Sequence, residues 1–380
     1  MAIRHLYGRA FVRGAILDDV LVTLSGGTIA GVAQTADVPA AAERVKGLIV
    51  PGFIDCHIHG GDGADFMDAD DAGNARILAF HARHGTTALA ATTLSASPQD
   101  LQKAVAAIAR TSRAGHPGAP GSQICAIHLE GPYINPERAG AQNPASMRPA
   151  DVQEVGALLA AAPELRWMIT LAPELAGARA LIEQFRDRVA FAIGHTAADY
   201  GTAMAALAWG ASHFTHLFNA MTGLHHRDPG AAGAALLSAE ATAELIADGI
   251  HVHPAVLQLA ARLMPHRIAL VTDAIRACGL ADGTYKLYKH DVTVAGGAAR
   301  LAGGALAGSL LTMSAAVRNM VALAGLPVET VIPLATEVPA RILGVAERKG
   351  RLERGYDADL VLLDESLGVE RVFARGIERF

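Results

Sequence analysis

Six side chains of the kinds that bind divalent metals follow short apolar runs in the middle of the sequence. They are His57, His59, Glu130, His195, His216 and Asp273. Imidazole and carboxylate groups in this combination suit zinc first, and also iron, manganese or cobalt. Each residue alone has an ordinary explanation, such as a helix cap at Asp273. Their shared position at the ends of apolar runs instead favours a site for one or two divalent metal ions.

The apolar runs alternate with Ala-rich segments of helical character. This alternation predicts repeated βα units around a parallel sheet. Eight runs qualify as strands, and eight strands close a (β/α)8 TIM barrel, an α/β fold. The expected strands are residues 48–54, 86–93, 124–129, 167–171, 189–193, 213–217, 242–247 and 268–272. Residues 101–110 and 152–161 are expected to form two of the intervening helices.

The spacing of the six side chains fits this barrel. The intervals from His59 to Glu130, and onward to His195, His216 and Asp273, equal about two, two, one and two βα units. Barrel enzymes carry their chemistry at the carboxyl ends of the strands. We therefore expect all six side chains to meet at one mouth of the barrel.

Alternation along the strands refines the expected site. His57 and His59 share one strand face, so Cys56 is expected to point outward to the helices. His128 lies two residues deeper than Glu130 and is expected to support the ligands. The chain has only five lysines, and Lys103, on an expected helix, is the only one between residues 47 and 285. A carbamylated lysine is therefore not expected, and Glu130 is the candidate for a ligand shared by two metals.

The two ends of the chain differ from the middle in their pattern of apolar residues. Short apolar runs separated by glycine turns occupy residues 1–50, and similar runs at 360–363 and 372–374 follow the last helical segment. Such runs are typical of strands. We expect residues 1–50 and 345–380 to form one small β-sandwich domain beside a catalytic barrel of residues 51–344.

The composition excludes several classes of protein. The chain has 380 residues, with 32 Lys and Arg against 37 Asp and Glu and a formal net charge of −5. Nucleic-acid binding needs clustered positive charge, so no nucleic-acid partner is expected. No apolar run reaches the roughly 18 residues of a membrane span, and no signal peptide is apparent. The three cysteines are too few for a disulfide framework. These observations predict a cytoplasmic protein with no membrane partner.

Seven segments carry a resemblance to a known family. They are PGFIDCHIHG at 51–60, HLEGP at 128–132, GHT at 194–196, THLFNAM at 215–221, ADGIH at 247–251, VTDA at 271–274 and LAGS at 306–309. On these motifs the whole chain resembles the N-acetylglucosamine-6-phosphate deacetylases of the amidohydrolase superfamily. The resemblance implies the same barrel, with a small β domain built from both termini.

The resemblance also implies a role for individual residues. The implied ligands of the main metal are Glu130, His195 and His216, and the implied second pair, which some members lack, is His57 and His59. Asp273 would be the general acid and base, and His251 would contact the substrate beside the scissile acetyl group.

Contacts to a phosphorylated amino sugar are implied as well. The implied residues are Ala141, Gln142, Asn219, Ala220, Arg227, Leu306, Ala307 and Gly308. Arg227 follows two histidines in a small cationic cluster of the sort that binds phosphate. Its family counterpart reaches across a dimer interface, so the resemblance implies a homodimer.

The implied reaction is hydrolysis of the N-acetyl group of N-acetyl-D-glucosamine 6-phosphate, in amino-sugar catabolism or recycling. One alternative keeps the metal site but acts on the galacto epimer or on another N-acyl substrate. A second alternative is a non-enzymatic scaffold of the same fold. Such scaffolds usually lose metal ligands, whereas this chain keeps all six candidates and His251.

Overall fold

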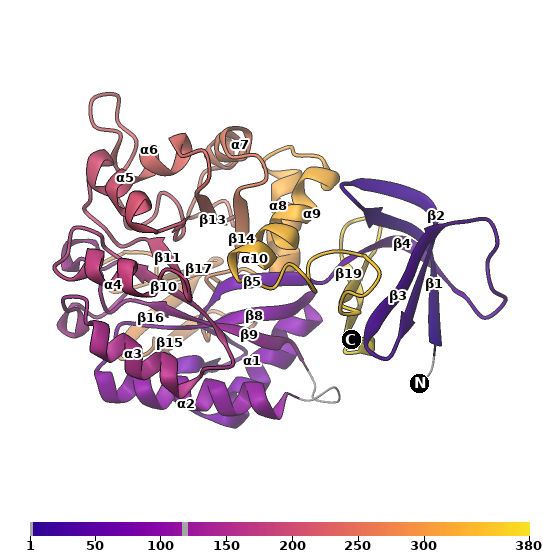
Figure 1. Ribbon diagram of the computed structural model, residues 1–380, viewed down its shortest axis with the longest axis horizontal. Coiled ribbons are helices and arrows are strands. Elements are labelled where there is room, and N and C mark those ends of the chain that lie inside the picture. Colours follow the sequence, from indigo (N-terminus) through magenta and orange to yellow (C-terminus); the bar gives the residue numbers. More distant parts are fainter. Residues whose placement is uncertain (1–2, 116–120) are drawn as a thin grey trace.

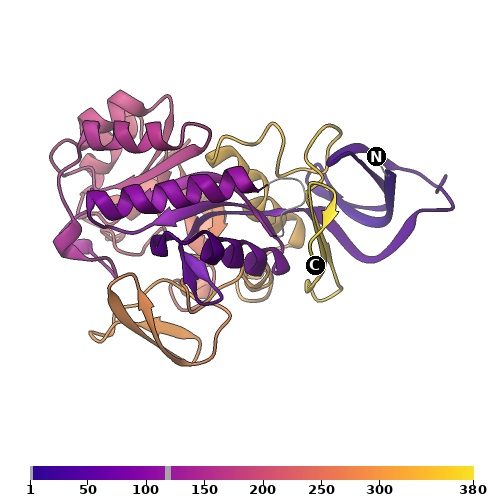
Figure 2. The ribbon, with the colours of Figure 1, turned by 90° about the horizontal axis from the view of Figure 1, so that it is seen from below.

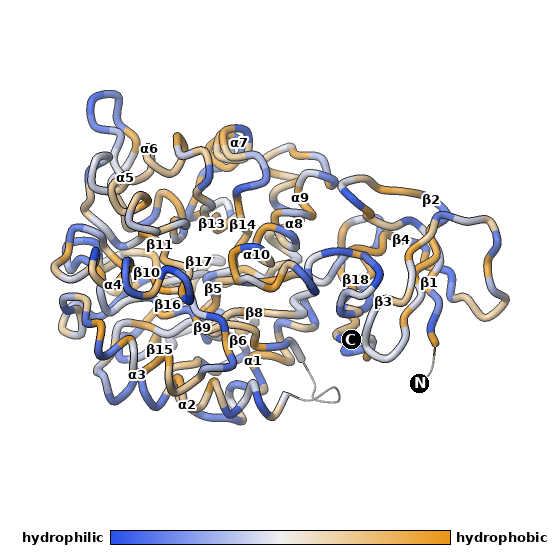
Figure 3. Tube along the Cα trace, in the orientation of Figure 1, coloured by the Kyte–Doolittle hydropathy of each residue, from blue (hydrophilic) through white to orange (hydrophobic). Residues whose placement is uncertain are grey.

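The computed structural model describes residues 3–115 and 121–380, and it contains a barrel with a smaller β-sheet region beside it (Figure 1). Both marked chain ends lie in the smaller region (Figure 1). Hydrophobic residues run through the central strands, and hydrophilic stretches gather in the outer loops (Figure 3). None of the described helices is long and apolar enough to cross a membrane.

Eight parallel strands form the barrel, which confirms the predicted fold class. In order around the sheet they are β5 (Phe53–Ile58), β8 (Thr86–Thr93), β9 (Gln123–Glu130), β10 (Arg166–Leu171), β11 (Val189–Ile193), β12 (His213–Phe214), β13 (Thr242–Ile246) and β14 (Ile268–Val271). The first and last strands meet just beyond their ends. There the Asp273 amide donates to the His57 carbonyl at 2.9 Å and the His59 amide donates to the Ala274 carbonyl at 2.9 Å.

The expected first strand, residues 48–54, was wrong in its bounds. The apolar run contains the end of β4 (Glu43–Pro51), which belongs to the smaller sheet, and the start of β5. Gly52 separates the two strands, and a Cβ atom there would lie 2.2 Å from Thr87 Oγ1. A continuous apolar run hides this change of sheet, because strands of both sheets are buried at that point.

Helices follow most barrel strands and cover the outside of the barrel (Figures 1 and 2). They are α1 (Asp71–Arg83), α2 (Pro98–Ala114), α3 (Val152–Ala161), α4 (Ala178–Phe185), α5 (Tyr200–Trp209), α6 (Gly230–Leu237), α7 (Pro254–Leu263), α8 (Met313–Ala322), α9 (Val328–Ala335) and α10 (Glu337–Ile342). The two expected helices are therefore confirmed, as part of α2 and as α3. Side-chain oxygens of Asp70, Ser97, Asp151 and Asp199 cap helix N-termini by accepting backbone N–H groups.

The smaller region is one seven-stranded sheet built from both ends of the chain. Its order is β20 (Ile377–Glu378), β19 (Val369–Ala374), β18 (Leu360–Leu363), β4, β1 (Ile3–Val12), β2 (Ala15–Ser25) and β3 (Thr28–Gln34). The sheet curls around its own apolar core, so that the Ile29 amide donates to the Tyr356 carbonyl at 2.8 Å. The expected small β-sandwich from both termini is thus confirmed in the form of one curled sheet.

A three-stranded sheet inserted after β14 was not expected from the sequence. It consists of β15 (Gly283–Leu287), β16 (His290–Ala295) and β17 (Ala298–Arg300), and it projects from the barrel (Figure 2). Its strands are short and partly polar, so they lack the long apolar runs that marked the barrel strands. Leu287 of this insertion lines the main cavity.

Candidate active site

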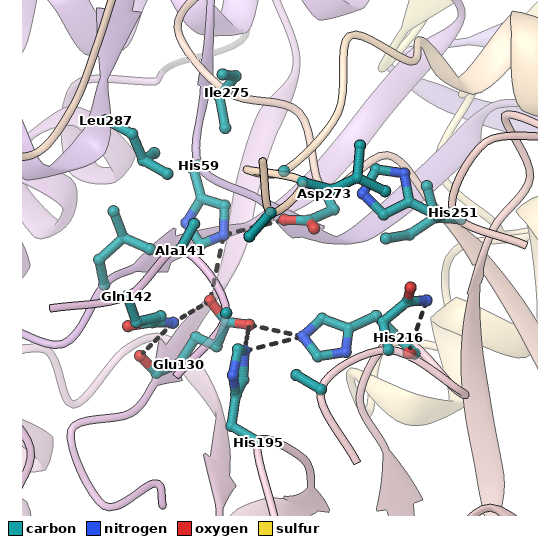
Figure 4. Close-up of a pocket in the computed structure, with 18 of the residues that line it drawn as sticks. His59, Glu130, Ala141, Gln142, His195, His216, His251, Asp273, Ile275 and Leu287 are labelled. Atoms are coloured by element: carbon teal, nitrogen blue, oxygen red, sulfur yellow. Dashed lines mark hydrogen bonds and ion pairs between the residues drawn. The ribbon is translucent and has the colours of Figure 1, made fainter. Parts of the chain in front are cut away.

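The carboxyl ends of the barrel strands bring all six predicted metal-type side chains to one mouth, as the sequence predicted. Figure 4 shows Glu130 with His59, His195, His216 and Asp273 around it. Glu130 ends β9, and it is only 3% exposed. The histidines and Asp273 are buried as well.

The Glu130 carboxylate lies at the centre of the cluster. Its Oε1 is 3.1 Å from Nε2 of both His195 and His216, and 3.4 Å from Nε2 of His57. Its Oε2 is 3.3 Å from Nε2 of His59. Oε1 therefore faces three imidazoles and Oε2 faces one, so this single carboxylate lies within reach of both predicted groups of histidines.

Asp273 lies on the side of the strand-one histidines. Its Oδ1 is 3.1 Å from Nε2 of His59 and 3.5 Å from Nε2 of His57. Burial lowers the pKa of His59, but hydrogen bonds to Asp273 and Glu130 outweigh it and raise that pKa to about 9. The neighbouring carboxylates thus strongly favour a positive charge at this point.

Three of these residues owe their orientation to an unusual backbone conformation. His195, His216 and Asp273 have φ angles of 46°, 28° and 48°, and each follows the last residue of its strand by two positions. Left-handed backbone at a non-glycine residue costs about 1–3 kcal/mol and tends to occur at functional sites. The strained turns direct the three side chains inward over the barrel mouth.

Hydrogen bonds to the far ring nitrogens select which imidazole nitrogen faces the cluster. His195 Nδ1 donates to the Arg138 carbonyl at 2.7 Å, and His57 Nδ1 donates to Glu244 Oε2 at 2.8 Å. Because carbonyl and carboxylate oxygens only accept, both Nδ1 atoms carry hydrogen, and Nε2 is left for a metal. The donor set of imidazole nitrogens and carboxylate oxygens therefore fits a divalent cation.

Glu244 supports the site, and sequence reasoning missed it. Besides His57, its carboxylate accepts the His216 amide at 2.9 Å and His213 Nε2 at 3.2 Å. Glu244 is fully buried in β13. A single acidic residue within an apolar strand was the available signal, since a buried carboxylate needs partners.

The expectation for Cys56 was wrong. Its sulfur lies within 4.8 Å of the ligand atoms of His213 and Glu244, inside the barrel and not among the helices. The register of β5 against β8 shifts between Asp55 and Ile58, so strict alternation fails there. His128 agrees with expectation, because it is buried and pairs through Nε2 with Thr170 Oγ1 at 2.7 Å.

A cavity of about 400 Å³ opens beside the cluster and is lined by most of the predicted substrate residues. Those present are Ala141, Gln142, Asn219, Ala220, His251, Leu306 and Gly308. Ala307 does not line it, since it is buried and its amide donates to the Ala299 carbonyl at 3.0 Å. Arg227 does not line it either, because it lies in an exposed loop beside His226.

Two of the lining side chains have defined partners. Gln142 donates from Nε2 to Glu130 Oε2 at 2.5 Å (Figure 4), and its Oε1 accepts the Ser95 amide at 2.6 Å. Its amide therefore holds the central carboxylate in place. His251 donates from Nδ1 to Asp248 Oδ2 at 2.6 Å, which leaves its Nε2 for other contacts.

Comparison with known proteins agrees with this arrangement. A family model described as "Amidohydrolase family" matches residues 48–377. An N-acetylgalactosamine-6-phosphate deacetylase of Escherichia coli O157:H7 is 40% identical over 363 residues, which cover 95% of this chain and 94% of that protein. An N-acetylglucosamine-6-phosphate deacetylase of Bacillus subtilis is 38% identical over 349 residues, which cover 90% of this chain and 86% of that protein.

The solved structures agree in fold over the full length. A mutant N-acetyl-D-glucosamine-6-phosphate deacetylase of Mycobacterium smegmatis, in complex with N-acetyl-D-glucosamine-6-phosphate, has a TM-score of 0.94 and 38% identity, with 100% of both chains covered. An N-acetylglucosamine-6-phosphate deacetylase of Thermotoga maritima has a TM-score of 0.88 at 32% identity, with 100% of this chain and 99% of that chain covered. The chain belongs to the amidohydrolase family.

Proposed function

We propose that the protein hydrolyses the acetamide of N-acetyl-D-glucosamine 6-phosphate, releasing D-glucosamine 6-phosphate and acetate. The observation that carries this proposal is the arrangement of Asp273 and His251 around one cavity beside the Glu130–His195–His216 cluster. Relatives that are named for this activity, at 37–38% identity over more than four-fifths of this chain, support the same substrate class.

Metal binding is assigned to five residues. Glu130, His195 and His216 would hold the main divalent cation, and His57 and His59 a second one that shares Glu130. Zinc is the proposed metal, with iron, manganese and cobalt as alternatives. When bound, the cation would supply Lewis acidity, which lowers the pKa of water toward about 7 and polarises the amide carbonyl.

Asp273 is the proposed general base and acid. Burial raises its pKa, but His57 and His59 outweigh this and hold the pKa below its usual range. The group therefore begins the reaction as a carboxylate and can accept the proton of the attacking water. It then delivers that proton to the departing amine nitrogen, which cannot leave as an anion.

His251 is the proposed contact to the acetyl oxygen. Asp248 accepts a hydrogen bond from its Nδ1 at 2.6 Å and so fixes the ring with Nε2 toward the cavity. An N–H group at Nε2 would donate to the negative charge that develops on the oxygen during attack.

The sugar and phosphate are proposed to lie along Ala141, Gln142, Asn219, Ala220, Leu306 and Gly308, which line the cavity. Ala307, which is buried, is proposed to support the Leu306–Gly308 loop through the hydrogen bond from its amide to the Ala299 carbonyl. In a homodimer, Arg227 would reach the cavity of the neighbouring subunit. We further propose that the enzyme works in the cytoplasm, in catabolism or recycling of amino sugars.

The galacto epimer is the second candidate substrate, because the relative with 40% identity is named for N-acetylgalactosamine 6-phosphate. The test is acetate release from both phosphorylated epimers and from unphosphorylated N-acetylglucosamine, with the metal content of the same sample. Preference for the phosphorylated gluco sugar supports the proposal, and preference for the galacto sugar replaces its substrate. A metal-free protein that releases no acetate contradicts the enzymatic assignment and restores the scaffold alternative.

A further inference from the structure

We propose that Arg138 binds the phosphate of the substrate within its own subunit and so determines the preference for phosphorylated sugars. This inference rests on the proposed function and adds a residue that the sequence did not single out. Arg138 ends the short helix η2 (Pro136–Arg138), which follows the HLEGP motif, and it lines the cavity beside the metal-type cluster.

The charges around the cavity point to Arg138. Among the described residues that line this cavity it is the only Lys or Arg, whereas Glu130, Glu137 and Asp273 are acidic. Glu130 and Asp273 are engaged with the histidines at the buried end. A phosphate monoester carries a charge of about −1.5 to −2 near pH 7. Arg138, which is exposed at the rim, supplies the permanent positive charge that such a group requires.

The guanidinium of Arg138 is available to a ligand. Within residues 3–115 and 121–380, its side chain takes part in no ion pair and no hydrogen bond, and neighbouring Glu137 forms no ion pair with it. By contrast, Arg148, ten residues further on, is held by Glu154 through contacts of 2.5 and 3.0 Å. An unpaired arginine at the rim keeps its planar donor face free for two phosphate oxygens.

The backbone that carries Arg138 is tied to the metal-type cluster. The Arg138 carbonyl accepts His195 Nδ1 at 2.7 Å, and the Asn135 amide donates to the His195 carbonyl at 2.9 Å. The Asn135 side chain also accepts the Glu137 amide at 2.9 Å. These bonds fix the turn at a constant position relative to His195, so a phosphate held by Arg138 sets the distance of the sugar from the reacting centre.

The same turn adjoins the residues proposed to contact the sugar phosphate. Gly140 adopts a φ angle of +58°, and a Cβ atom there would lie 3.2 Å from His195 Cε1 and 4.0 Å from Ala220 Cβ. Gly140 therefore lies close to both His195 and Ala220. Arg138 and the Asn219–Ala220 pair line the same cavity.

Arg138 differs from Arg227 in where it acts. Arg227 lies outside the cavity of its own subunit, so its proposed contact requires a partner. Arg138 needs none. The two arginines would hold the phosphate from the two subunits of a dimer, and Arg138 alone would do so in a monomer.

The test compares steady-state deacetylation of N-acetylglucosamine 6-phosphate and of unphosphorylated N-acetylglucosamine by the wild type and by Arg138→Gln. We expect KM for the phosphorylated sugar to rise by about 10- to 100-fold, as for a lost charge-assisted hydrogen bond. Activity on the unphosphorylated sugar should stay within about twofold. Calorimetric binding of D-glucosamine 6-phosphate against D-glucosamine provides a second readout that is independent of turnover.

Matched variants separate local charge from general effects. Arg138→Lys keeps the charge but loses the planar fork, so it should retain part of the preference. Glu137→Gln removes the adjacent negative charge and should lower KM for the phosphorylated sugar. Arg110→Gln, an exposed change on α2, controls for the loss of one positive charge remote from the cavity.

The outcomes distinguish this inference from the proposed function. A wild type that deacetylates without preferring the phosphorylated sugar overturns the phosphate part of both. A wild-type preference that survives in Arg138→Gln overturns the role of Arg138 alone. Equal losses on both substrates also overturn it, because they indicate a displaced turn and not a lost phosphate contact.

Discussion

Two clusters of buried charged residues in this molecule differ in how their negative charges are balanced. At the junction of the barrel and the smaller sheet, Lys349 Nζ lies 2.8 Å from Asp357 Oδ2 and 2.6 Å from Asp359 Oδ2. Arg348 pairs with Asp357 at 2.8 Å, and the Arg375 amide donates to Asp359 at 2.7 Å. Two cations balance two carboxylates, and Lys349 is only 4% exposed.

The cluster at the barrel mouth is not balanced in this way. It contains the carboxylates of Glu130, Glu244 and Asp273 with five imidazoles, and no lysine or arginine of the described residues pairs with these carboxylates. The pKa of His59, raised to about 9 by its carboxylate neighbours in spite of burial, reflects the missing positive charge. A buried cluster whose negative charges are neutralised by lysine and arginine of the same chain stabilises the fold. A buried cluster that lacks such cations is suited to bind an added metal ion.

The largest expected effect is removal of a proposed metal ligand from the cluster at the barrel mouth. His195→Ala should lose both bound metal and activity, because His195, His216 and Glu130 are the proposed ligands of the main cation. Metal content by mass spectrometry and acetate release are the measurements. His5→Ala, in the smaller sheet, is the matched histidine control and should change neither. Full metal occupancy in His195→Ala would remove this residue from the ligand set.

The next effect separates proton transfer from metal binding. Asp273→Asn keeps the shape of the side chain but cannot accept a proton, so kcat should fall by about 10²–10⁴-fold. Bound metal should remain, since Glu130, His195 and His216 are unchanged. Turnover near the wild-type rate would contradict the role of Asp273 as base and acid.

A substitution in the charge-balanced cluster of Lys349, Asp357 and Asp359 should lower the stability of the protein and leave its catalytic rate unchanged. Lys349→Ala leaves Asp357 and Asp359 buried without a partner ammonium, and loss of one partner in a buried ion pair costs about 3–5 kcal/mol. We expect a lower free energy of unfolding in urea, with metal content per folded chain and kcat unchanged. Lys103→Ala is the control, because Lys103 is exposed on α2. Wild-type stability in Lys349→Ala would contradict the stabilising role of this cluster and, with it, the difference between the two clusters.

The barrel and the meeting of the six metal-type side chains at its mouth could be predicted from the sequence because both depend on local signals. Apolar runs mark the strands, and a histidine or carboxylate directly after a run must lie at the mouth. Glu244 could not be assigned in this way, since its role arises from three partners on other strands. The orientation of Cys56 failed because a register shift in β5 leaves no mark in the pattern. Arg138 was missed because its neighbours Glu137 and Pro136 give it the appearance of an ordinary surface turn.

The smallest expected effect concerns Glu244, a buried carboxylate whose two oxygens both accept hydrogen bonds from other residues of the chain. Oε2 accepts His57 Nδ1 and the His216 amide, and Oε1 accepts His213 Nε2. Glu244→Gln preserves the shape but removes the charge that strengthens His57 as a ligand. Loss of such a supporting carboxylate typically weakens metal binding by about 10–100-fold.

Metal affinity, measured by competition with a chelator, should therefore fall in Glu244→Gln, more for the ion that involves His57 than for the main one. Glu154→Gln, which removes a partly buried carboxylate from the Arg148 pair, is the matched control and should leave metal affinity unchanged. If Glu244→Gln lowers stability as Lys349→Ala does but leaves metal affinity intact, Glu244 belongs with the balanced cluster. If metal affinity falls while stability stays at the wild-type level, Glu244 belongs with the metal-type cluster. A carboxylate that has no oxygen free for a cation would then still affect metal binding through His57, which it holds in place.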